Sequence, residues 1–238
     1  MTKTVVITGT SRGIGRALAE NYVKQGWTVF ATARILSTIE STLPPNAKKH
    51  SLDVTSETSI ASFVEAIGSK TPVHLLINNA GTLPPPKPFE SIGKQEMMDA
   101  FEVNAVGPVL VTQALYENLK LGAAVAAGGN GVGGVVANLS SILASIEKNM
   151  TGSYHACRAS KAANNSFSKS LAFDLKPNGI SILQFHPGYV KTDMSPQGIV
   201  SPQRSAEGIA KVIDQAFTDT AFNMTGQFFD FQGKKLPW

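Results

Sequence analysis

Residues 8–15 read Thr8-Gly9-Thr10-Ser11-Arg12-Gly13-Ile14-Gly15, and they lie between an apolar run at residues 4–8 (TVVIT) and a segment of helical periodicity at residues 15–25. The glycines at positions 9, 13 and 15 let the backbone turn tightly and approach a pyrophosphate closely. The helix start adds free N–H groups and a partial positive charge. Between a first strand and a first helix, such a pattern predicts a dinucleotide-binding turn. The alternative is a glycine-rich tight turn that binds no ligand.

Outside this turn, apolar runs of strand length alternate with amphipathic segments of helical length. Strands are predicted at residues 4–8, 28–31, 73–77, 135–139 and 180–185. Helices are predicted at residues 15–25, 57–69, 94–119, 159–175 and 206–217. Each crossover between parallel strands must cover one face of the sheet, so this alternation predicts an α/β fold with a doubly wound parallel sheet. Connecting loops are expected at residues 83–88 and 122–134.

Length and composition limit the classes of protein to which the chain can belong. With 238 residues, 42% of them hydrophobic, it is long enough for a packed core, and we expect one domain over residues 1–238. A single cysteine excludes a disulfide framework within the chain, and the first apolar run is broken at Gly9, before a signal peptide could form. We therefore expect a cytoplasmic protein.

Neither a membrane nor a nucleic acid is an expected partner. No window has the roughly eighteen uninterrupted apolar residues of a membrane span, and the nearest stretch, residues 122–136, is broken by Asn130. The net charge is +4, but the basic residues are scattered, with no pair denser than Lys48-Lys49 or Lys234-Lys235. The expected partner is a small-molecule substrate.

Further motifs follow the glycine turn in order. They are Asn78-Asn79-Ala80-Gly81, Asn104, Ser160-Lys161-Ala162-Ala163 and Pro187-Gly188-Tyr189-Val190-Lys191-Thr192. Together with the Gly-x-x-x-Gly-x-Gly spacing, they resemble the short-chain dehydrogenase/reductase family over nearly the whole chain. The loop before Val135, the segment between Ser141 and Lys161, and the ending at residues 226–230 with Pro237-Trp238 are most similar to carbonyl reductases of the sniffer type.

The resemblance implies a Rossmann fold, a homodimer or homotetramer packed through the two long helices, and a nicotinamide cofactor. The residues that it assigns to cofactor binding are Gly9, Ser11, Arg12, Gly13, Ile14, Gly15, Arg34, Asp53, Val54, Asn79, Ala80, Gly81, Lys161, Pro187, Gly188, Val190 and Thr192. Asp53 stands where the family has an adenine-binding aspartate.

Charge at the end of the second strand indicates which nicotinamide cofactor is bound. NAD enzymes place a carboxylate there, on the ribose diol, and that carboxylate would repel a 2′-phosphate. This chain has Ala33 and then Arg34, while Arg12 in the glycine turn can reach the same phosphate. Two guanidinium groups near one phosphate give charge-assisted contacts. The pattern favours NADP(H).

The catalytic pattern departs from the family at one position. The resemblance implies a tyrosine acid four residues before Lys161, but Cys157 stands there. It also implies that Ser141 positions the substrate, that Lys161 holds the ribose and biases the acid, and that Asn104 supports a proton-relay water. The expected catalytic residues are Asn104, Ser141, Tyr154, Cys157 and Lys161.

Cys157 leaves several interpretations open. Free cysteine is usually a small buried core residue. As a functional thiol, with an ordinary pKa of about 8.5, it would have its pKa lowered by Lys161 and by the helix start. A thiol ends nearer the backbone than a phenol, so it is poorly placed as a direct replacement acid.

Tyr154 and His155 are the other candidate proton donors. Tyr154 lies seven residues before Lys161, so on an unbroken helix the two would share a face, two turns apart. His155 carries a donor of suitable pKa. Each residue type is more often found in packing or on the surface. The other histidines, at 50, 74 and 186, show no metal-ligand spacing, so no metal is expected.

The leading hypothesis is an NADP(H)-dependent oxidoreductase that acts on a carbonyl or alcohol of a small organic molecule. One alternative keeps the cofactor pocket but catalyses a non-redox step, as an isomerase, cyclase or dehydratase does. Another is a catalytically silent cofactor-binding protein. Residues 195–204 are expected to form a lid over the substrate.

Overall fold

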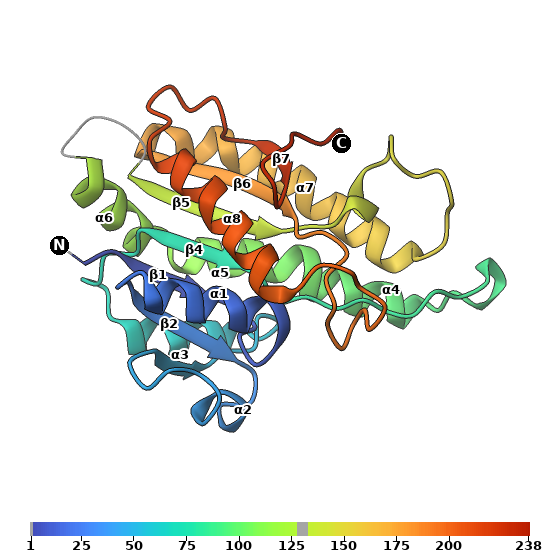
Figure 1. The fold of residues 1–238 in the computed structure, drawn as a ribbon, viewed down its shortest axis with the longest axis horizontal. Helices are drawn as coiled ribbons and strands as arrows, with labels where there is room; N and C mark the ends of the chain where they lie inside the picture. The colour runs from blue at the N-terminus through green and yellow to red at the C-terminus, as the bar shows by residue number, and fades with distance from the viewer. Residues whose placement is uncertain (1, 128–132) are drawn as a thin grey trace.

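The computed structural model describes residues 2–127 and 133–238 (Figure 1). Within these ranges, seven parallel strands form one sheet in the order β3-β2-β1-β4-β5-β6-β7. The strands are β1 (Thr4–Ile7), β2 (Thr28–Ala33), β3 (Lys48–Ser51), β4 (Leu75–Asn78), β5 (Gly134–Leu139), β6 (Ile180–His186) and β7 (Gln227–Asp230). The α-helices are α1 (Gly13–Lys24), α2 (Ser37–Glu40), α3 (Glu57–Ile67), α4 (Lys94–Phe101), α5 (Gly107–Ala114), α6 (Tyr116–Ala127), α7 (His155–Leu175) and α8 (Pro202–Phe217). The predicted doubly wound parallel sheet in a single-domain Rossmann fold is confirmed.

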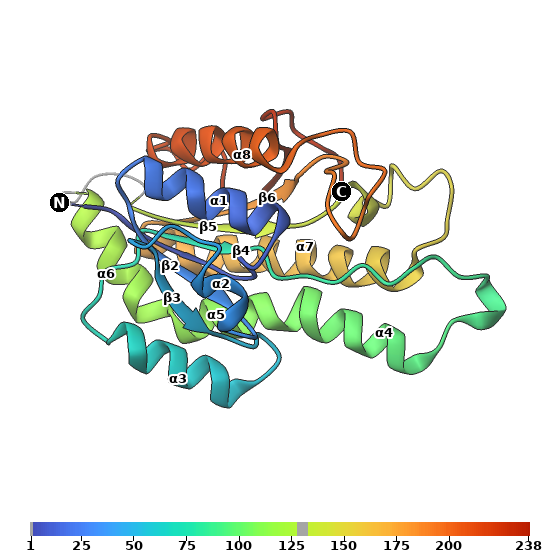
Figure 2. The ribbon, with the colours of Figure 1, turned by 60° about the horizontal axis from the view of Figure 1, so that its bottom comes forward.

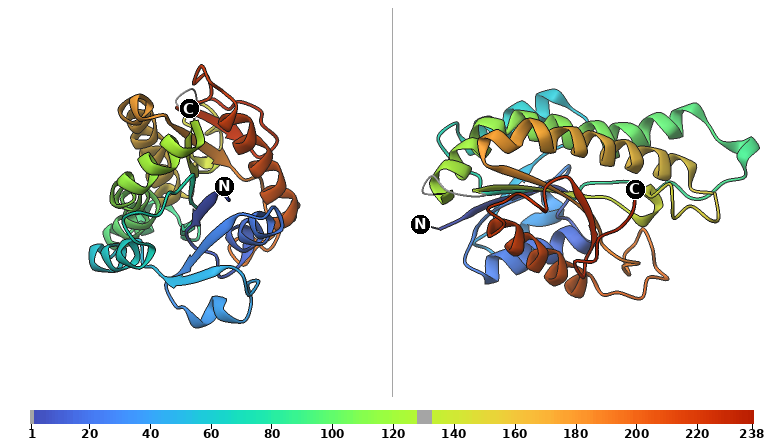
Figure 3. Two further views of the ribbon diagram at one scale, coloured as in Figure 1. Left: turned by 90° about the vertical axis from the view of Figure 1, so that its left-hand side faces the viewer. Right: turned by 90° about the horizontal axis from the view of Figure 1, so that it is seen from above.

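Helices cover both faces of the sheet (Figures 2 and 3). Helices α1 and α8 pack on one face, and α3, α5, α6 and α7 pack on the other. The strands supply both layers because successive side chains point to opposite faces. Val5 and Ile7 of β1 face α1 and α8, whereas Val6 faces the other layer.

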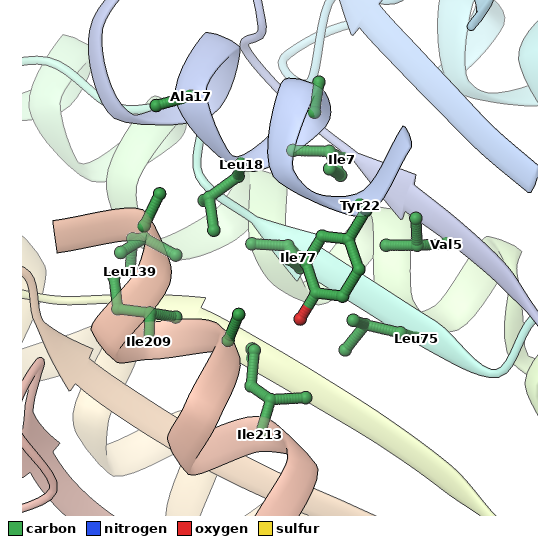
Figure 4. Packing of buried hydrophobic residues seen from close by; sticks show 14 of the residues in the cluster. Val5, Ile7, Ala17, Leu18, Tyr22, Leu75, Ile77, Leu139, Ile209 and Ile213 are labelled. Atoms are coloured by element: carbon green, nitrogen blue, oxygen red, sulfur yellow. The ribbon is translucent and has the colours of Figure 1, made fainter. Parts of the chain in front are cut away.

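The core on the α1 and α8 side is built around Tyr22 (Figure 4). Its ring is fully buried among Ile7, Leu18, Ile77 and Ile213, which come from two helices and two strands. Full burial of side chains of this size contributes about 1.5–3 kcal/mol each. This packing fixes α1, and with it the glycine turn that precedes the helix.

Two strands and the short helix α2 were not expected, and one expected helix is divided. Strand β3 (KKHS) is an exposed edge strand without an apolar run, and β7 (QFFD) buries only its two central residues, so hydrophobic periodicity detected neither. The helix expected at residues 94–119 is divided into α4, a π-helical turn η2 (Glu102–Val106), α5 and α6. A π turn is compatible with the 3.6-residue pattern on both sides, so the pattern did not reveal it.

The expected loop at residues 122–134 is partly wrong. Helix α6 continues through Gly122 to Ala127, whereas residues 128–132 lie outside the described residues. Gly122 lets α6 pack closely on the segment before β4, because a Cβ there would overlap the Val73 carbonyl. In the described parts of the chain, no helix has the length and apolar character needed to cross a bilayer.

Candidate active site

The candidate site lies at the carboxyl ends of the central strands. Strand order reverses between β1 and β4, and open α/β sheets bind ligands at such a switch point. The glycine turn follows β1, residues 79–81 follow β4, Ser140-Ser141 follow β5, and residues 187–192 follow β6. The fold therefore brings the sequence motifs to one edge of the sheet.

The glycine turn has the backbone geometry of a phosphate cradle. Gly9 and Gly13 have positive φ angles, +71° and +57°, which L side chains rarely adopt. A Cβ on Gly15 would overlap the Gly9 carbonyl oxygen and the Asn79 side-chain nitrogen. Helix α1 begins at Gly13, and its N-cap, Arg12, makes no side-chain capping bond. The first N–H groups of the helix therefore remain available to an anion.

Residues 78–81 fasten this turn to β4 and β5. The Asn79 amide donates to the Thr8 and Gly9 carbonyls, each at 2.9 Å. The Thr8 hydroxyl accepts the backbone N–H groups of Asn79 and Ala80, and the Asn78 amide donates to Asn138 on β5 at 2.8 Å. Asn79 and Ala80, predicted as cofactor contacts, thus also hold the glycine turn in shape.

The two arginines expected at a 2′-phosphate occupy different surroundings. Arg34 is exposed directly after buried Ala33 at the end of β2. The Arg12 guanidinium pairs with Asp193 at 3.2 Å, and both side chains are exposed, so the pair contributes little stability. Arg12 is thus free to exchange Asp193 for a phosphate.

Asp53 lies beside Arg34 and precedes buried Val54. Its carboxylate accepts the backbone N–H and the hydroxyl of Thr55, at 3.0 and 2.8 Å. Partial burial alone would raise the pKa of Asp53, but these two bonds and the Arg34 charge outweigh it and lower the pKa. The carboxylate is therefore an ionised acceptor at neutral pH.

Asn104 lies in the π turn η2 and is fully buried. Its side-chain amide donates to the Thr82 carbonyl and the Ser160 hydroxyl, each at 3.0 Å, and its oxygen accepts the Thr82 N–H at 2.9 Å. The turn thus places one amide between the loop after β4 and helix α7. Asn104 therefore joins these two segments, and π-bulges are frequent at functional sites.

Lys161 points from α7 toward the end of β5. Its Nζ is buried and donates to the Leu139 carbonyl at 2.6 Å. Burial lowers the pKa of Lys161 to about 8, although the neighbouring Cys157 opposes this shift. A Cβ on Gly81 would lie 3.4 Å from this Nζ and 3.2 Å from the Asn104 oxygen. The structure therefore brings Gly81, Asn104 and Lys161 together.

Cys157 is buried one turn before Lys161. Burial raises the pKa of the thiol, and the opposing effects of Lys161 and Arg158 do not compensate. The hypothesis of an activated thiolate is therefore wrong for this structure, because desolvation penalises the charged form more than the nearby cations favour it. The thiol is neutral at physiological pH.

Tyr154 is not on the helix that carries Lys161. Helix α7 begins at His155, and Tyr154 has a left-handed backbone, with φ 50° and ψ 36°, directly after Ser153 at φ 59°. The expected two-turn relation of Tyr154 to Lys161 therefore fails, because it required an unbroken helix. The His155 ring lies edge-on to Phe89 of the loop after β4, at 6.5 Å between centroids.

Of the two serines after β5, only Ser141 is partly accessible. The Ser140 hydroxyl is buried and donates to Asn165 on α7 at 2.7 Å. The Ser141 hydroxyl accepts the Leu143 N–H at 3.1 Å, which leaves its proton available to a ligand. Ser141 therefore stays the predicted substrate-positioning residue.

Residues 187–192 cross over the glycine turn. A Cβ on Gly13 would lie 3.1 Å from the Thr192 methyl group, and Val190 forms an isolated bridge to Val200. Gly188, after Pro187, has φ +89° against the Phe231 ring. Residues 202–204 of the lid expected at residues 195–204 belong to α8, which begins at Pro202 with the Ser201 hydroxyl as its N-cap.

His186 was not predicted as a functional residue. Its Nδ1 accepts the Ile142 N–H at 3.1 Å, one residue after Ser141. Burial lowers the pKa of His186 to about 4, against the attraction of Asp230, so the ring is neutral at physiological pH. Its position directly before Pro187-Gly188 was the available signal, and it could have placed His186 beside the site.

Comparison with known proteins identifies the family of this chain. The family model described as short chain dehydrogenase matches residues 3–199. C-signal of Myxococcus xanthus is 35% identical over 168 residues, covering 70% of this chain and 93% of that protein. The carbonyl reductase Sniffer of D. melanogaster superposes with a TM-score of 0.88 at 29% identity and full coverage of both chains. The NADPH-bound carbonyl reductase from chicken fatty liver gives 0.88 at 27% identity, covering 100% of this chain and 99% of that chain. The chain belongs to the short-chain dehydrogenase family.

Proposed function

We propose that this protein is an NADP(H)-dependent oxidoreductase that acts on a carbonyl or alcohol of a small organic molecule. The observation that carries the proposal is the cradle at the switch point. Gly9 and Gly13 adopt positive φ angles, and Gly15 has no room for a side chain, directly before the free N–H groups of α1. Such a turn accepts a pyrophosphate. The relative that was solved with NADPH bound has the same fold over its whole length.

The residues around the cradle fit a dinucleotide that carries a 2′-phosphate. Exposed Arg12 and Arg34 supply positive charge, and Ala33 puts no carboxylate at the end of β2. Asp53, with its lowered pKa, offers an ionised acceptor for adenine N–H groups. In this proposal the other cofactor contacts are the predicted ones, and residues 1–238 act as one NADP(H)-binding domain.

NADPH, when bound, supplies a hydride for a carbonyl carbon, and the protein must supply the proton. We assign that proton to Lys161. Its ammonium has a pKa of about 8, so it still carries its proton at neutral pH, and it uses one N–H to bond the Leu139 carbonyl. Ser141 orients the substrate oxygen with its free hydroxyl proton, and Asn104 holds Thr82 and α7 around it. Cys157, as a neutral thiol, fills space beside Lys161.

Steady oxidation of NADPH in the presence of a reactive dicarbonyl or a quinone tests the proposal directly. Loss of absorbance at the nicotinamide band at a rate that saturates with the carbonyl compound is the expected result. Product formation without loss of NADPH would instead identify an isomerase, cyclase or dehydratase. Tight NADPH binding without turnover of a broad panel would identify a cofactor-binding protein. The dimer or tetramer and the cytoplasmic location stay predictions.

Substitution at position 157 tests whether the phenol of a tyrosine is the only catalytic group that the candidate site lacks. We expect Cys157→Tyr to raise carbonyl reductase activity by about tenfold or more, within the range for restoring a general acid. Cys157→Ser conserves size, and because the thiol is neutral, it should leave the native rate nearly unchanged. If Cys157→Tyr changes no turnover while NADPH still binds, position 157 is not at the reaction centre.

A further inference from the structure

The segment between Ser141 and α7 (residues 142–154) borders the candidate site and carries two large exposed apolar side chains. Ile146 is 80% exposed and Met150 is 85% exposed. Ligand sites are lined mainly by apolar side chains with a few polar groups. Beside Ser141, these two side chains are suited to contact the apolar part of a substrate. The positions of Ile146 and Met150 depend on the contacts that hold residues 142–154.

Side chains of β6 and α7 fix the two ends of the segment by hydrogen bonds. At its start, the Ile142 N–H donates to His186 on β6 at 3.1 Å. At its end, the Arg158 guanidinium of α7 donates to the carbonyls of Gly152 and Ser153, each at 3.0 Å. The middle, which carries Ile146 and Met150, lies between these anchors.

Trp238 contacts this middle part from another direction. After β7 the chain turns back, and the Leu236 N–H donates to the Phe228 carbonyl at 2.8 Å. The Trp238 indole then stacks on the Phe228 ring, with 5.7 Å between centroids and 17° between planes. The Trp238 carbonyl accepts the Glu147 N–H at 3.1 Å. Figures 1 and 2 both show this chain end beside the segment after β5.

We propose that Trp238 is a positioning residue that selects substrates: its stack on Phe228 fixes its carbonyl, which fixes Glu147 between Ile146 and Met150. Phe228 is fully buried in β7, so it is a rigid platform, whereas Trp238 is 40% exposed and is held by this stack. The inference rests on the proposed function, and it commits the substrate class to carbonyl compounds with a bulky apolar or aromatic group.

The first test does not depend on activity. Hydrogen–deuterium exchange of residues 145–151 is measured in the NADPH-loaded wild type, in Trp238→Ala and in Trp238→Phe. We expect faster exchange at Glu147 in Trp238→Ala and near-wild-type exchange in Trp238→Phe, because a phenyl ring can still stack on Phe228. Unchanged exchange in Trp238→Ala overturns the proposal.

The second test measures selection. We expect Trp238→Ala to raise KM for a bulky aromatic ketone by about tenfold, the loss expected when an apolar side chain such as Ile146 or Met150 no longer packs on the ketone. Three quantities should change by less than about twofold: KM for diacetyl, kcat and the Kd of NADPH. In Trp238→Phe, KM for the aromatic ketone should return to the wild-type value. Trp27→Ala is the control: Trp27 also packs on an aromatic ring, but near the C-terminus of α1, and should lower Tm without changing selectivity.

Equal rises in KM for both carbonyl compounds, or a fall in NADPH affinity, would refute selection by Trp238. If the wild type turns over neither compound, the proposed oxidoreductase function fails. The same comparison is then made by calorimetric binding of the ketone to the NADPH-loaded protein. In this binding experiment, equal affinity of the ketone for the wild type and for Trp238→Ala would overturn the inference.

Discussion

His186 should make the stability of this protein sensitive to mild acid. In the folded protein its Nδ1 accepts the Ile142 N–H, which requires a neutral ring. Burial lowers its pKa to about 4 from the 6.5 of a free histidine. The unfolded chain therefore binds more protons between these two pH values, so this stability is present above pH 6.5 and is lost progressively as the pH falls from 6.5 to 4.

The expected loss follows from these two pKa values. Integrating the difference in bound protons from pH 7 to pH 5 gives about 2 kcal/mol of unfolding free energy. That is a large part of the roughly 5–15 kcal/mol of a typical domain. His50 and His74, whose pKa values are also lowered by burial, add losses of the same sign. The His186 contribution must therefore be isolated by substitution.

The His186 contribution to the free energy of unfolding is isolated by comparing the wild type with His186→Asn. Urea unfolding of both proteins is followed by circular dichroism at pH 7, 6 and 5. The Asn oxygen can accept the Ile142 N–H but does not titrate, so the variant should lose about 2 kcal/mol less than the wild type between pH 7 and pH 5. His74→Asn is the matched control, because His74 Nδ1 also accepts a backbone N–H, that of Thr4. The His74→Asn variant should still lose the unfolding free energy that protonation of His186 removes. Equal losses in the wild type and His186→Asn would refute the reasoning.

Three further predictions concern the cofactor and the proton. NADPH should bind more tightly than NADH, and Arg34→Asp should reverse or abolish the preference, because it places a like charge against the 2′-phosphate; dissociation constants from nicotinamide fluorescence check this. Gly13→Val should weaken NADPH binding by orders of magnitude, since it adds side-chain atoms at φ +57° beside Thr192, whereas Gly26→Val, at φ +80° with open space around it, should not. The rate of carbonyl reduction should fall as the pH rises through about 8, where Lys161 loses its proton; a pH–rate profile that stays flat to pH 10 would refute that role.

Most of the fold follows from hydrophobic periodicity, and the exceptions have identifiable causes. The five central strands are buried on both faces and appear in the sequence as apolar runs. Strand β3 has no such run because it is an edge strand, and Lys48 is exposed there. The sequence predicts a loop at Gly122, but this residue lies in α6 and lets the helix pack against the Val73 backbone. A close approach of this kind is a tertiary feature, and local sequence does not report it.

Residue identity predicted which motifs meet at the site, but not how they are held. The helix predicted at residues 159–175 includes Lys161 but not Cys157, whereas α7 carries both. Local sequence did not show that three consecutive left-handed residues, Gly152, Ser153 and Tyr154, precede α7, because residues such as Ser153 and Tyr154 rarely adopt positive φ angles. Nor could it show that Asn104 lies in a π turn, because the insertion of a single residue leaves the flanking periodicity intact.

Burial decides the chemistry of position 157, and burial was the quantity that the sequence did not supply. Proximity to Lys161 alone favours a thiolate, and the same proximity favours a charged lysine. In the structure both groups are buried, so desolvation raises the pKa of one and lowers the pKa of the other, toward two neutral groups. Of these two groups, only Lys161, with a pKa of about 8, exchanges its proton near neutrality. A reaction that needs a proton at a developing oxyanion can take it there, whereas a reaction that needs a thiolate nucleophile cannot start from Cys157.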